Sequence, residues 1–397
     1  MDWKRHSAEE GQEATNIPST WLYLHYYEAF NVLFRVENAL RILVYVVLKN
    51  SHRDKWIGIS LSSDEDTETT ISALAKKRIT QHQTFGYLGY PIEAPMMHLT
   101  SGELVRLITS NAHWPLFKDF FLASRQVVTL KLQEIGDIRN SLAHFRPITE
   151  GDVEAAKQNS KQMLSSVEAA LGSMIMCSQR VPTNTTDEWY QELRPLGTDL
   201  CSFEFHQSTD GRWIRITLRF KARILTQPPE EPRTLVTYNV LNIDTPEVLN
   251  RYDELRCLVI YLTERVPYVS MPQDFRPLFG KELQFTFSAP TLTKEYDKLR
   301  ENLKRLLAHI DTEAELIAQD NLARGNLIHL IQLAARKKEI KERTWWFVER
   351  EGLRCPVQSH HPTEYWGSIS MPGENLISDS DEFPWMPSSI CPGEVPF

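Results

Sequence analysis

The chain has 397 residues, a formal net charge of −8 at pH 7 and 24% charged residues. This length allows two or three domains, and the composition is that of an ordinary globular protein. The acidic balance argues against a uniformly basic nucleic-acid-binding protein, so any RNA contact must be a local patch.

The cysteines and the apolar runs indicate the compartment. Five cysteines are scattered along the chain without a C-x-x-C pair, which disfavours a zinc site and a disulfide framework and favours a reducing compartment. Residues 1–17 are polar, which predicts a flexible N-terminus without a signal-peptide core. The most apolar run, residues 40–48, contains Arg41 and is too short to span a bilayer. We therefore expect a cytoplasmic protein without a metal, a cofactor or a membrane partner.

Helical periodicity dominates residues 18–178. A long helix is predicted over 21–49, apolar around much of its circumference, as is typical of a central bundle helix or a dimerisation helix. Within it, Glu37 and Arg41 are i, i+4 partners. Further helices are expected over 68–78 and 101–111, and from the Thr-x-x-Asp capping signal at 149 to 176. One helix or a pair of helices is expected from Pro115 into residues 139–144.

The most informative stretch is residues 139–144, Arg-Asn-Ser-Leu-Ala-His, at the end of a helix that Pro147 closes. A guanidinium can hold a phosphate through paired N–H donors, and an imidazole can take and return a proton near neutral pH. Together they can cleave RNA without a metal, because the ribose 2′-OH serves as the nucleophile. The alternative is structural: Arg139 caps or salt-bridges at the helix terminus, and His144 is a cation favoured by the helix dipole.

The helical spacing of these two residues does not by itself bring their side chains together. Five positions at helical pitch put Arg139 and His144 about 140° apart around the axis. They converge only if the arginine reaches around the frayed helix end, or if two copies meet across a symmetric interface.

Three blocks in this order resemble the HEPN superfamily. They are Val-Glu-Asn-Ala-Leu-Arg at 36–41, Leu-Thr-Ser-Gly-Glu-Leu at 99–104 with the aromatic residues that follow, and Arg139-Asn140 with His144. The resemblance covers about the first 180 residues and implies an all-α bundle. It also implies a metal-independent endoribonuclease that works as a homodimer, with Arg139, Asn140 and His144 catalytic and with Glu37 and Arg41 near the cleft.

The resemblance also suggests a biological setting. HEPN domains occur in toxin–antitoxin, abortive-infection and other antiviral systems, so an antitoxin or another defence protein is an expected partner beside the RNA substrate. Some members have lost catalysis. The alternative function is therefore a non-catalytic dimerisation or scaffold module that binds RNA or a protein.

The pattern changes after a polar, proline-containing linker predicted at 178–188. Residues 189–350 are predicted to form an α+β domain with a sensory, regulatory or RNA-binding role, with strands at 214–220, 234–241 and 283–287 and helices at 246–264, 292–319 and 321–350. In the first strand, apolar residues alternate with Arg215, Thr217, Arg219 and Lys221. This predicts a solvated outer face, and the alternative is an RNA-binding platform of Arg215, Arg219 and Lys221.

Residues 351–397 are rich in proline, serine and acidic residues, which predicts an irregular tail. Trp366 is one of a few aromatic residues there that are candidates for docking onto the body of the protein or onto a partner. The predicted fold class is therefore multidomain α+β: an all-α HEPN-like bundle at 18–178, an α+β domain at 189–350 and an irregular tail.

Overall fold

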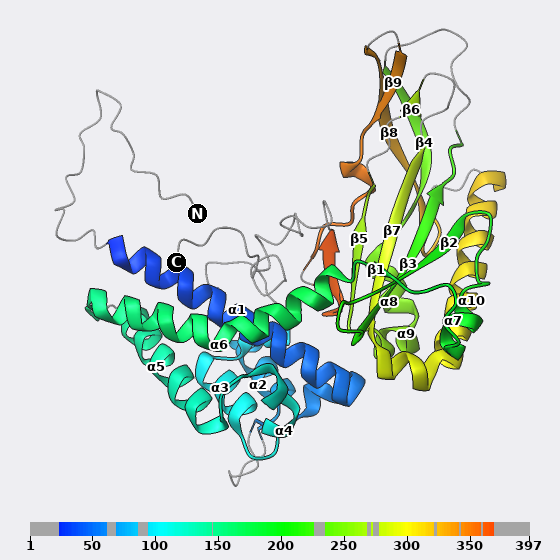
Figure 1. The fold of residues 1–397 in the computed structure, drawn as a ribbon. Coiled ribbons are helices and arrows are strands. Elements are labelled where there is room, and N and C mark those ends of the chain that lie inside the picture. Colours follow the sequence, from blue (N-terminus) through cyan, green and yellow to red (C-terminus); the bar gives the residue numbers. More distant parts are fainter. Residues whose placement is uncertain are drawn as a thin grey trace, which may run out of the picture.

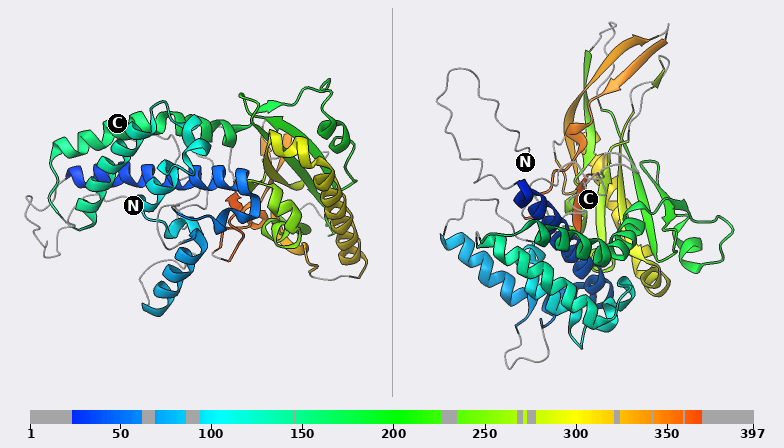
Figure 2. Two further views of the ribbon diagram at one scale, coloured as in Figure 1. Left: turned by 90° about the horizontal axis from the view of Figure 1, so that it is seen from below. Right: turned by 60° about the vertical axis from the view of Figure 1, so that its left-hand side comes forward.

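The computed structural model describes residues 24–61, 69–85, 94–144, 146–225, 235–267, 271–272, 278–320, 324–340, 343–358 and 360–368. A helical bundle lies beside two β-sheets, and a long helix flanks the larger sheet on the side away from the bundle (Figure 1). The two longest bundle helices run side by side towards the sheet (Figure 2). The predicted α+β class, with a helical N-terminal part, is confirmed.

The bundle follows the predicted order of helices. Its α-helices are α1 (Leu24–His52), α2 (Ile71–Phe85), α3 (Ser101–Thr109), α4 (Trp114–Phe117), α5 (Arg125–Ala143) and α6 (Glu150–Met176). Short 3₁₀ turns lie between them: η2 (Arg53–Gly58), η3 (Pro95–His98) and η4 (Lys118–Phe120). The stretch expected from Pro115 onwards to be one helix or a pair is interrupted at 121–124, so that α5 begins separately and the second alternative is confirmed.

Helix α1 is the centre of the bundle. Every residue from 39 to 49 is buried, including the charged Arg41 and Lys49. Helices α3, α5 and α6 pack against α1, which explains why its sequence is apolar on nearly all sides.

Two capping boxes set the starts of α3 and α6. The Thr149 hydroxyl accepts from the amide of Asp152 at 3.2 Å, and the Asp152 carboxylate accepts from the amide of Thr149 at 2.7 Å. Thr100 and Glu103 make the same reciprocal pair at α3. These bonds satisfy amide groups that a helix N-terminus otherwise leaves unpaired.

The larger sheet has the strand order β1-β2-β3-β7-β5-β10. Its strands are β1 (Gln179–Arg180), β2 (Cys201–Gln207), β3 (Trp213–Ala222), β5 (Tyr261–Arg265), β7 (Phe279–Ser288) and β10 (Tyr365–Ser368). Neighbours are antiparallel except β10, which runs parallel to β5. Gly211, with φ of +69°, makes the turn between β2 and β3 in the backbone conformation that glycine favours.

Helices pack on the apolar face of this sheet. They are α7 (Glu188–Leu193), α8 (Thr245–Arg251), α9 (Asp253–Leu258) and α10 (Ala289–Asp320). Helix α10 was expected over 292–319 and is confirmed, and it contacts α7, α9 and β7. The single helix expected over 246–264 is wrong. The chain leaves helical geometry at Tyr252 (φ −117°, ψ 73°), and after α9 it becomes β5.

The smaller sheet corrects a second prediction. Its order is β4-β8-β9-β6, with β4 (Leu235–Ile243), β8 (Ile328–Ile340), β9 (Arg343–Val348) and β6 (Met271–Pro272). The helix expected over 321–350 is therefore wrong. Residues such as Leu, Ala, Arg, Lys and Glu favour a helix locally, but β8 pairs along its length with β4 and β9, and this pairing overrides local propensity.

The tail prediction is wrong for its first part. A 3₁₀ turn, η5 (Glu351–Leu353), is followed by β10 at the sheet edge. Trp366 is completely buried, and its ring stacks on Tyr261 with 4.1 Å between ring centroids and an interplanar angle of 1°. The expected docking of this tryptophan onto the body of the protein is therefore confirmed, whereas residues 369–397 lie outside the described residues.

The bundle and the sheet are joined by buried polar contacts. The Tyr45 hydroxyl of α1 donates to the carbonyl of Ile260 at 2.7 Å, and the Tyr261 hydroxyl donates to the carbonyl of Met174 at 3.2 Å. The Lys49 ammonium pairs with Glu364 at 2.7 Å. The stretch expected to be a linker, 178–188, contains β1, which pairs with β2.

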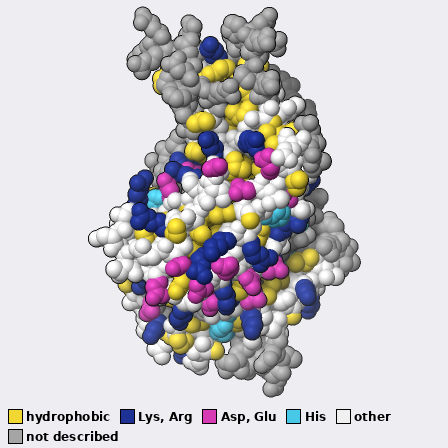
Figure 3. All heavy atoms as spheres, turned by 90° about the vertical axis from the view of Figure 1, so that its right-hand side faces the viewer, with side chains coloured by type: hydrophobic (Ala, Val, Ile, Leu, Met, Phe, Trp, Pro, Cys, Tyr) yellow, Lys and Arg dark blue, Asp and Glu magenta, His cyan; other side chains and the backbone are white. Residues whose placement is uncertain are grey.

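The side of the molecule that faces away from the bundle is covered with charges of both signs (Figure 3). On α10, Lys298 pairs with Glu295 at 2.8 Å and Lys304 with Glu301 at 3.3 Å. Exposed pairs of this kind contribute little to stability. This face therefore has the character of an ordinary solvated surface.

Candidate functional site

The Arg-Asn-x-x-x-His stretch ends helix α5. Val128, Leu132, Ile135 and Leu142 are buried and fix the face that α5 turns to the bundle. The amide of His144 still donates to the carbonyl of Asn140 at 3.1 Å, so helical pitch holds as far as His144. Asn140 and His144 are exposed, whereas Arg139 lies at the edge of the packed face with 37% of its side chain accessible.

Glu37 of α1 connects this stretch to the rest of the bundle. Its carboxylate lies 3.7 Å from Nε of Arg139 and accepts a hydrogen bond from the Ser101 hydroxyl at 2.8 Å. It also pairs with Arg41, as the i, i+4 spacing predicted. One carboxylate thus gathers groups from α1, α3 and α5.

Arg41 is the buried member of this cluster. It donates to the side chain of Asn38 at 3.2 Å and to the carbonyl of Leu99 at 3.4 Å. Burial lowers the pKa of Arg41, Glu37 opposes that effect, and the charge of Arg139 lowers it further. Two guanidinium groups share one carboxylate, so the cluster carries excess positive charge, which favours an anion nearby.

A groove of about 470 Å³ lies between α3 and α5, and we call it the α3–α5 groove. Its lining consists of Thr100, Ser101, Gly102, Val105, Arg106, Thr109, Thr129, Leu132, Gln133, Gly136, Asp137, Arg139 and Asn140. Arg139 and Asn140 contribute one end, and their side chains are joined by a contact of 3.4 Å. The lining of this groove, as far as the structure describes it, does not include His144.

The structure therefore brings some of the predicted residues together and leaves one apart. Arg139, Asn140, Glu37 and Arg41 form one connected cluster. His144 stands on the solvent side of α5, about 140° around the helix axis from Arg139 because the pitch is intact. The helical pitch thus directs the imidazole and the guanidinium to different sides of α5.

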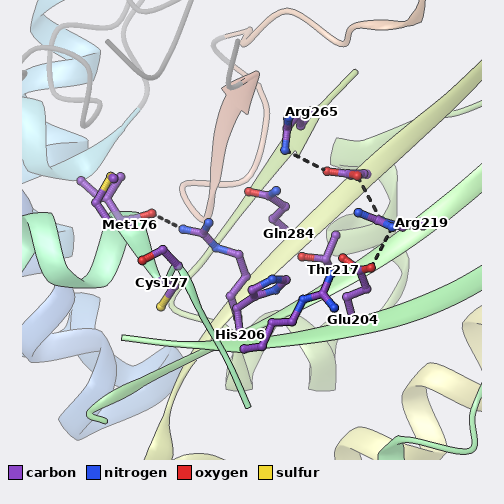
Figure 4. A pocket seen from close by; sticks show the side chains of 13 residues that line it. Met176, Cys177, Glu204, His206, Thr217, Arg219, Arg265 and Gln284 are labelled. Carbon is purple, nitrogen blue, oxygen red and sulfur yellow. Dashed lines mark hydrogen bonds and ion pairs between the residues drawn. The ribbon is translucent and has the colours of Figure 1, made fainter. Parts of the chain in front are cut away.

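The strand residues proposed for RNA binding lie on a partly covered face. Arg215 is buried and donates to the carbonyl of Ile175 at the end of α6. Arg219 lies 2.7 Å from Glu204 and 3.1 Å from Glu282 (Figure 4). Lys221 is exposed. The solvated outer face that the alternation predicted is therefore present at Arg219 and Lys221, whereas the end of α6 covers Arg215.

Two general features bear on the chemistry. Within the described ranges no group of three or more His, Cys, Asp or Glu side chains is arranged to hold a metal ion. Among those same residues no helix has the length and apolar character needed to cross a membrane.

Sequence reasoning missed the contact of Ser101 with Glu37. The Thr-x-x-Glu pattern at 100–103 signals the start of a helix, but no local pattern shows which distant residue its first turn faces. It also missed the enclosure of the polar face of β3, because the covering residues of α6 lie about 40 positions earlier in the chain.

Comparison of the chain with protein-family models, with curated proteins and with solved structures gave no match. The functional assignment therefore depends on the residues and their arrangement.

Proposed function

We propose that the protein is a metal-independent endoribonuclease whose catalytic groups are Arg139, Asn140 and His144. The observation that carries the proposal is the position of these residues at the exposed end of α5, with Arg139 oriented by Glu37 at the mouth of the α3–α5 groove. The order of the three sequence blocks that resemble the HEPN superfamily is the second support.

The reaction follows from the groups available. The ribose 2′-OH attacks the adjacent phosphorus, and His144 accepts its proton as a general base. Arg139 stabilises the extra negative charge on the phosphorane oxygens through paired N–H donors. The bond from phosphorus to the 5′-oxygen breaks, and an imidazolium returns a proton to that oxygen. The products are a 2′,3′-cyclic phosphate and a 5′-hydroxyl end.

Glu37 acts as a positioning residue. It contacts Nε of Arg139, so the terminal guanidinium nitrogens lie towards Asn140 and the groove. Arg41 shares the same carboxylate from its buried position, and the Ser101 hydroxyl supplies a further hydrogen bond. This arrangement limits the rotamers of a long side chain before substrate arrives, which lowers the entropic cost of binding the phosphate.

The site is completed by a second copy of the chain. In one copy His144 faces away from Arg139, and a two-fold axis can place the imidazole of one copy beside the guanidinium of the other. Phe30 and Phe34, two helical turns and one helical turn before Glu37, are 53% and 49% exposed. Exposed aromatic side chains next to an incomplete site are suited to a dimer interface.

We place this activity in the cytoplasm of a prokaryotic cell, in a toxin or antiviral defence system. The support is the resemblance to HEPN domains, which also suggests an antitoxin or another defence protein as partner.

The proposal is tested by incubating RNA with the wild-type chain, Arg139→Ala and His144→Ala in the presence of EDTA. Loss of a general acid–base group is expected to reduce cleavage by about 10²–10⁴-fold, and loss of the arginine by a similar factor. Arg125→Ala, at the other end of the same helix, and His360→Ala, an exposed histidine outside the bundle, are the matched controls. Equal cleavage by all variants, or a requirement for magnesium, would refute the proposal.

A non-catalytic dimerisation or scaffold module is the second candidate. The ion pair of Arg139 with Glu37, 3.7 Å apart, also fits a purely structural role that holds α5 on α1. In that case Arg139→Ala melts at a lower temperature than the wild type, and no form of the protein cuts RNA.

A further inference from the structure

A second pocket lies where the bundle meets the larger sheet, and we call it the sheet pocket. It has a volume of about 290 Å³. Its lining consists of Ile175, Met176, Cys177, Ser178, Arg180, Glu204, His206, Arg215, Thr217, Arg219, Arg265, Glu282 and Gln284. Strands β2, β3, β5 and β7 form its floor, and the end of α6 forms one wall (Figure 4).

The strand register orders the floor into cross-strand rows. In one row Arg219 lies opposite Glu282, which lies opposite Arg265 on the next strand. In the adjacent row Thr217 lies opposite Gln284. Side chains directly opposite each other on one face of a sheet are in contact distance, so these rows form one continuous polar surface.

This surface is unusual because it is polar and yet covered. Gln284 and Glu282 are each only 6% exposed, and Arg215 is 9% exposed. On most sheets a covered face is apolar, and buried polar groups are paired. Open volume above such convergent polar groups gives them room to bind and orient a small polar molecule.

Several polar atoms there have no hydrogen-bond partner among the described residues. They are Nε of Arg215, Nε of Arg265 and Oε1 of Gln284. Leaving such atoms unsatisfied is destabilising, and each is almost fully enclosed, so the two guanidinium groups and the Gln284 amide must turn slightly to offer these atoms to a bound group. Two of these atoms are donors on cationic groups, and the third is an acceptor.

The charges indicate the class of ligand. Four arginines, Arg180, Arg215, Arg219 and Arg265, face two glutamates in the lining. Planar guanidinium groups match phosphate oxygens, and glutamate carboxylates together with the Gln284 carbonyl accept from hydroxyl groups. His206 is neutral near pH 7, because burial lowers the pKa of its imidazole despite the opposing charge of Glu204. It therefore offers one donor and one acceptor.

We propose that the sheet pocket binds a small phosphorylated ligand that also carries hydroxyl groups, either a sugar phosphate or a mononucleotide. The phosphate contacts the guanidinium groups of Arg180, Arg215 and Arg265, and the hydroxyl groups contact Gln284 and the glutamates. The volume is at the lower end of ligand pockets, which are about 300–1,000 Å³, so a polynucleotide does not fit. The site is distinct from the α3–α5 groove and does not depend on the ribonuclease proposal.

The test is isothermal titration calorimetry on the full chain with ribose 5-phosphate, AMP, inorganic phosphate and adenosine as probes. We expect saturable binding of ribose 5-phosphate or AMP at one site per chain, and the tighter of the two identifies the ligand class. Arg180→Ala, an exposed residue on the pocket rim, and Arg265→Gln should each weaken binding by about ten- to a hundredfold. Arg212→Ala, an exposed arginine of the β2–β3 turn outside this pocket, is the matched control and should bind like the wild type.

Three results would overturn the proposal. They are no binding of any phosphorylated probe, unchanged affinity in both Arg180→Ala and Arg265→Gln, and inorganic phosphate binding as tightly as ribose 5-phosphate. If Arg265→Gln does not fold, Arg180→Ala alone decides, because its side chain is exposed and its loss leaves no buried group unpaired.

Discussion

The most direct test of the packing in the larger sheet is to break its fully buried ion pair. Lys281 of β7 and Glu264 of β5 lie 3.1 Å apart, and both side chains are 0% exposed. They lie on the apolar face of the sheet, where Lys281 is opposite Phe220 and Glu264 is opposite Leu283. Such a pair persists only when its remaining hydrogen-bonding groups are satisfied.

Those groups come from distant parts of the chain. Lys281 also donates to the carbonyl of Ile243 at 2.9 Å. Glu264 accepts from the Ser368 hydroxyl at 2.8 Å and from the amide of Cys355. Burial alone would lower the pKa of Lys281, but Glu264 and Cys355 raise it above the usual value for lysine. The stabilisation from the charged lysine is therefore complete at neutral pH and is lost only as the pH rises through the raised pKa.

Lys281→Met removes the cation and leaves a buried carboxylate without its partner. Breaking a buried pair in this way is expected to lower the free energy of unfolding by about 3–5 kcal/mol. The double variant Lys281→Met/Glu264→Gln removes both charges and should lose less stability than the sum of the losses in Lys281→Met and Glu264→Gln, by a coupling energy of about 1–3 kcal/mol.

The measurement is urea unfolding at pH 7 followed by tryptophan fluorescence. Lys298→Met, which breaks the exposed Lys298–Glu295 pair at 2.8 Å, is the control and should leave the midpoint unchanged. If Lys281→Met were as stable as the wild type, or if the double variant lost the sum of the two single effects, the pair would not be coupled and the reasoning would be wrong.

If the active site joins two copies, mixing inactive Arg139→Ala with inactive His144→Ala should restore about a quarter of wild-type cleavage, because half of the dimers are mixed and each has one intact site; no recovery would place both groups on one copy. The pKa of Glu313 lies below its usual range, since the amides of residues 326–328 outweigh the effect of burial. Its contribution to stability is therefore present above the unfolded-state pKa and lost as the pH falls through the lowered value. Glu313→Gln should thus lower the melting temperature at pH 7 and reduce the fall in melting temperature below about pH 4.5. Trp366→Ala should cost about 3–5 kcal/mol in unfolding free energy, measured by chemical denaturation, and an unchanged stability would show that β10 is dispensable.

Much of the bundle could be predicted because its signals are local. Capping residues lie three positions apart, as in Thr149 and Asp152, and apolar periodicity shows which side of each helix is buried. The Glu37–Arg41 pair was predictable for the same reason, since one helical turn separates its members. The contact of Glu37 with Arg139 depends on how two helices pack, and the sequence carries no local signal for that.

The part of the chain after the bundle was harder to predict because its structure depends on pairing between distant segments. Residues 328–340 resemble a helix in composition and became β8 because β4, about 90 positions earlier, pairs with them. The segment 365–368 looked irregular, yet it adds a strand beside β5 and buries Trp366. Strand pairing of this kind is a non-local interaction, and propensity alone does not reveal it.

The same non-local contacts make the bundle and the sheets dependent on one another. The second half of α1 is buried on all sides, and part of that cover comes from the sheet, where Ile260 accepts from Tyr45 and Glu364 pairs with Lys49. Without the sheet, the ammonium of Lys49 would lose its buried carboxylate, and apolar residues of α1 would be exposed to water. An unpaired charge in such a position is strongly destabilising. Helix α1, which orients Arg139 through Glu37, is therefore held in place partly by Glu364, which lies 315 residues after Lys49 in the chain.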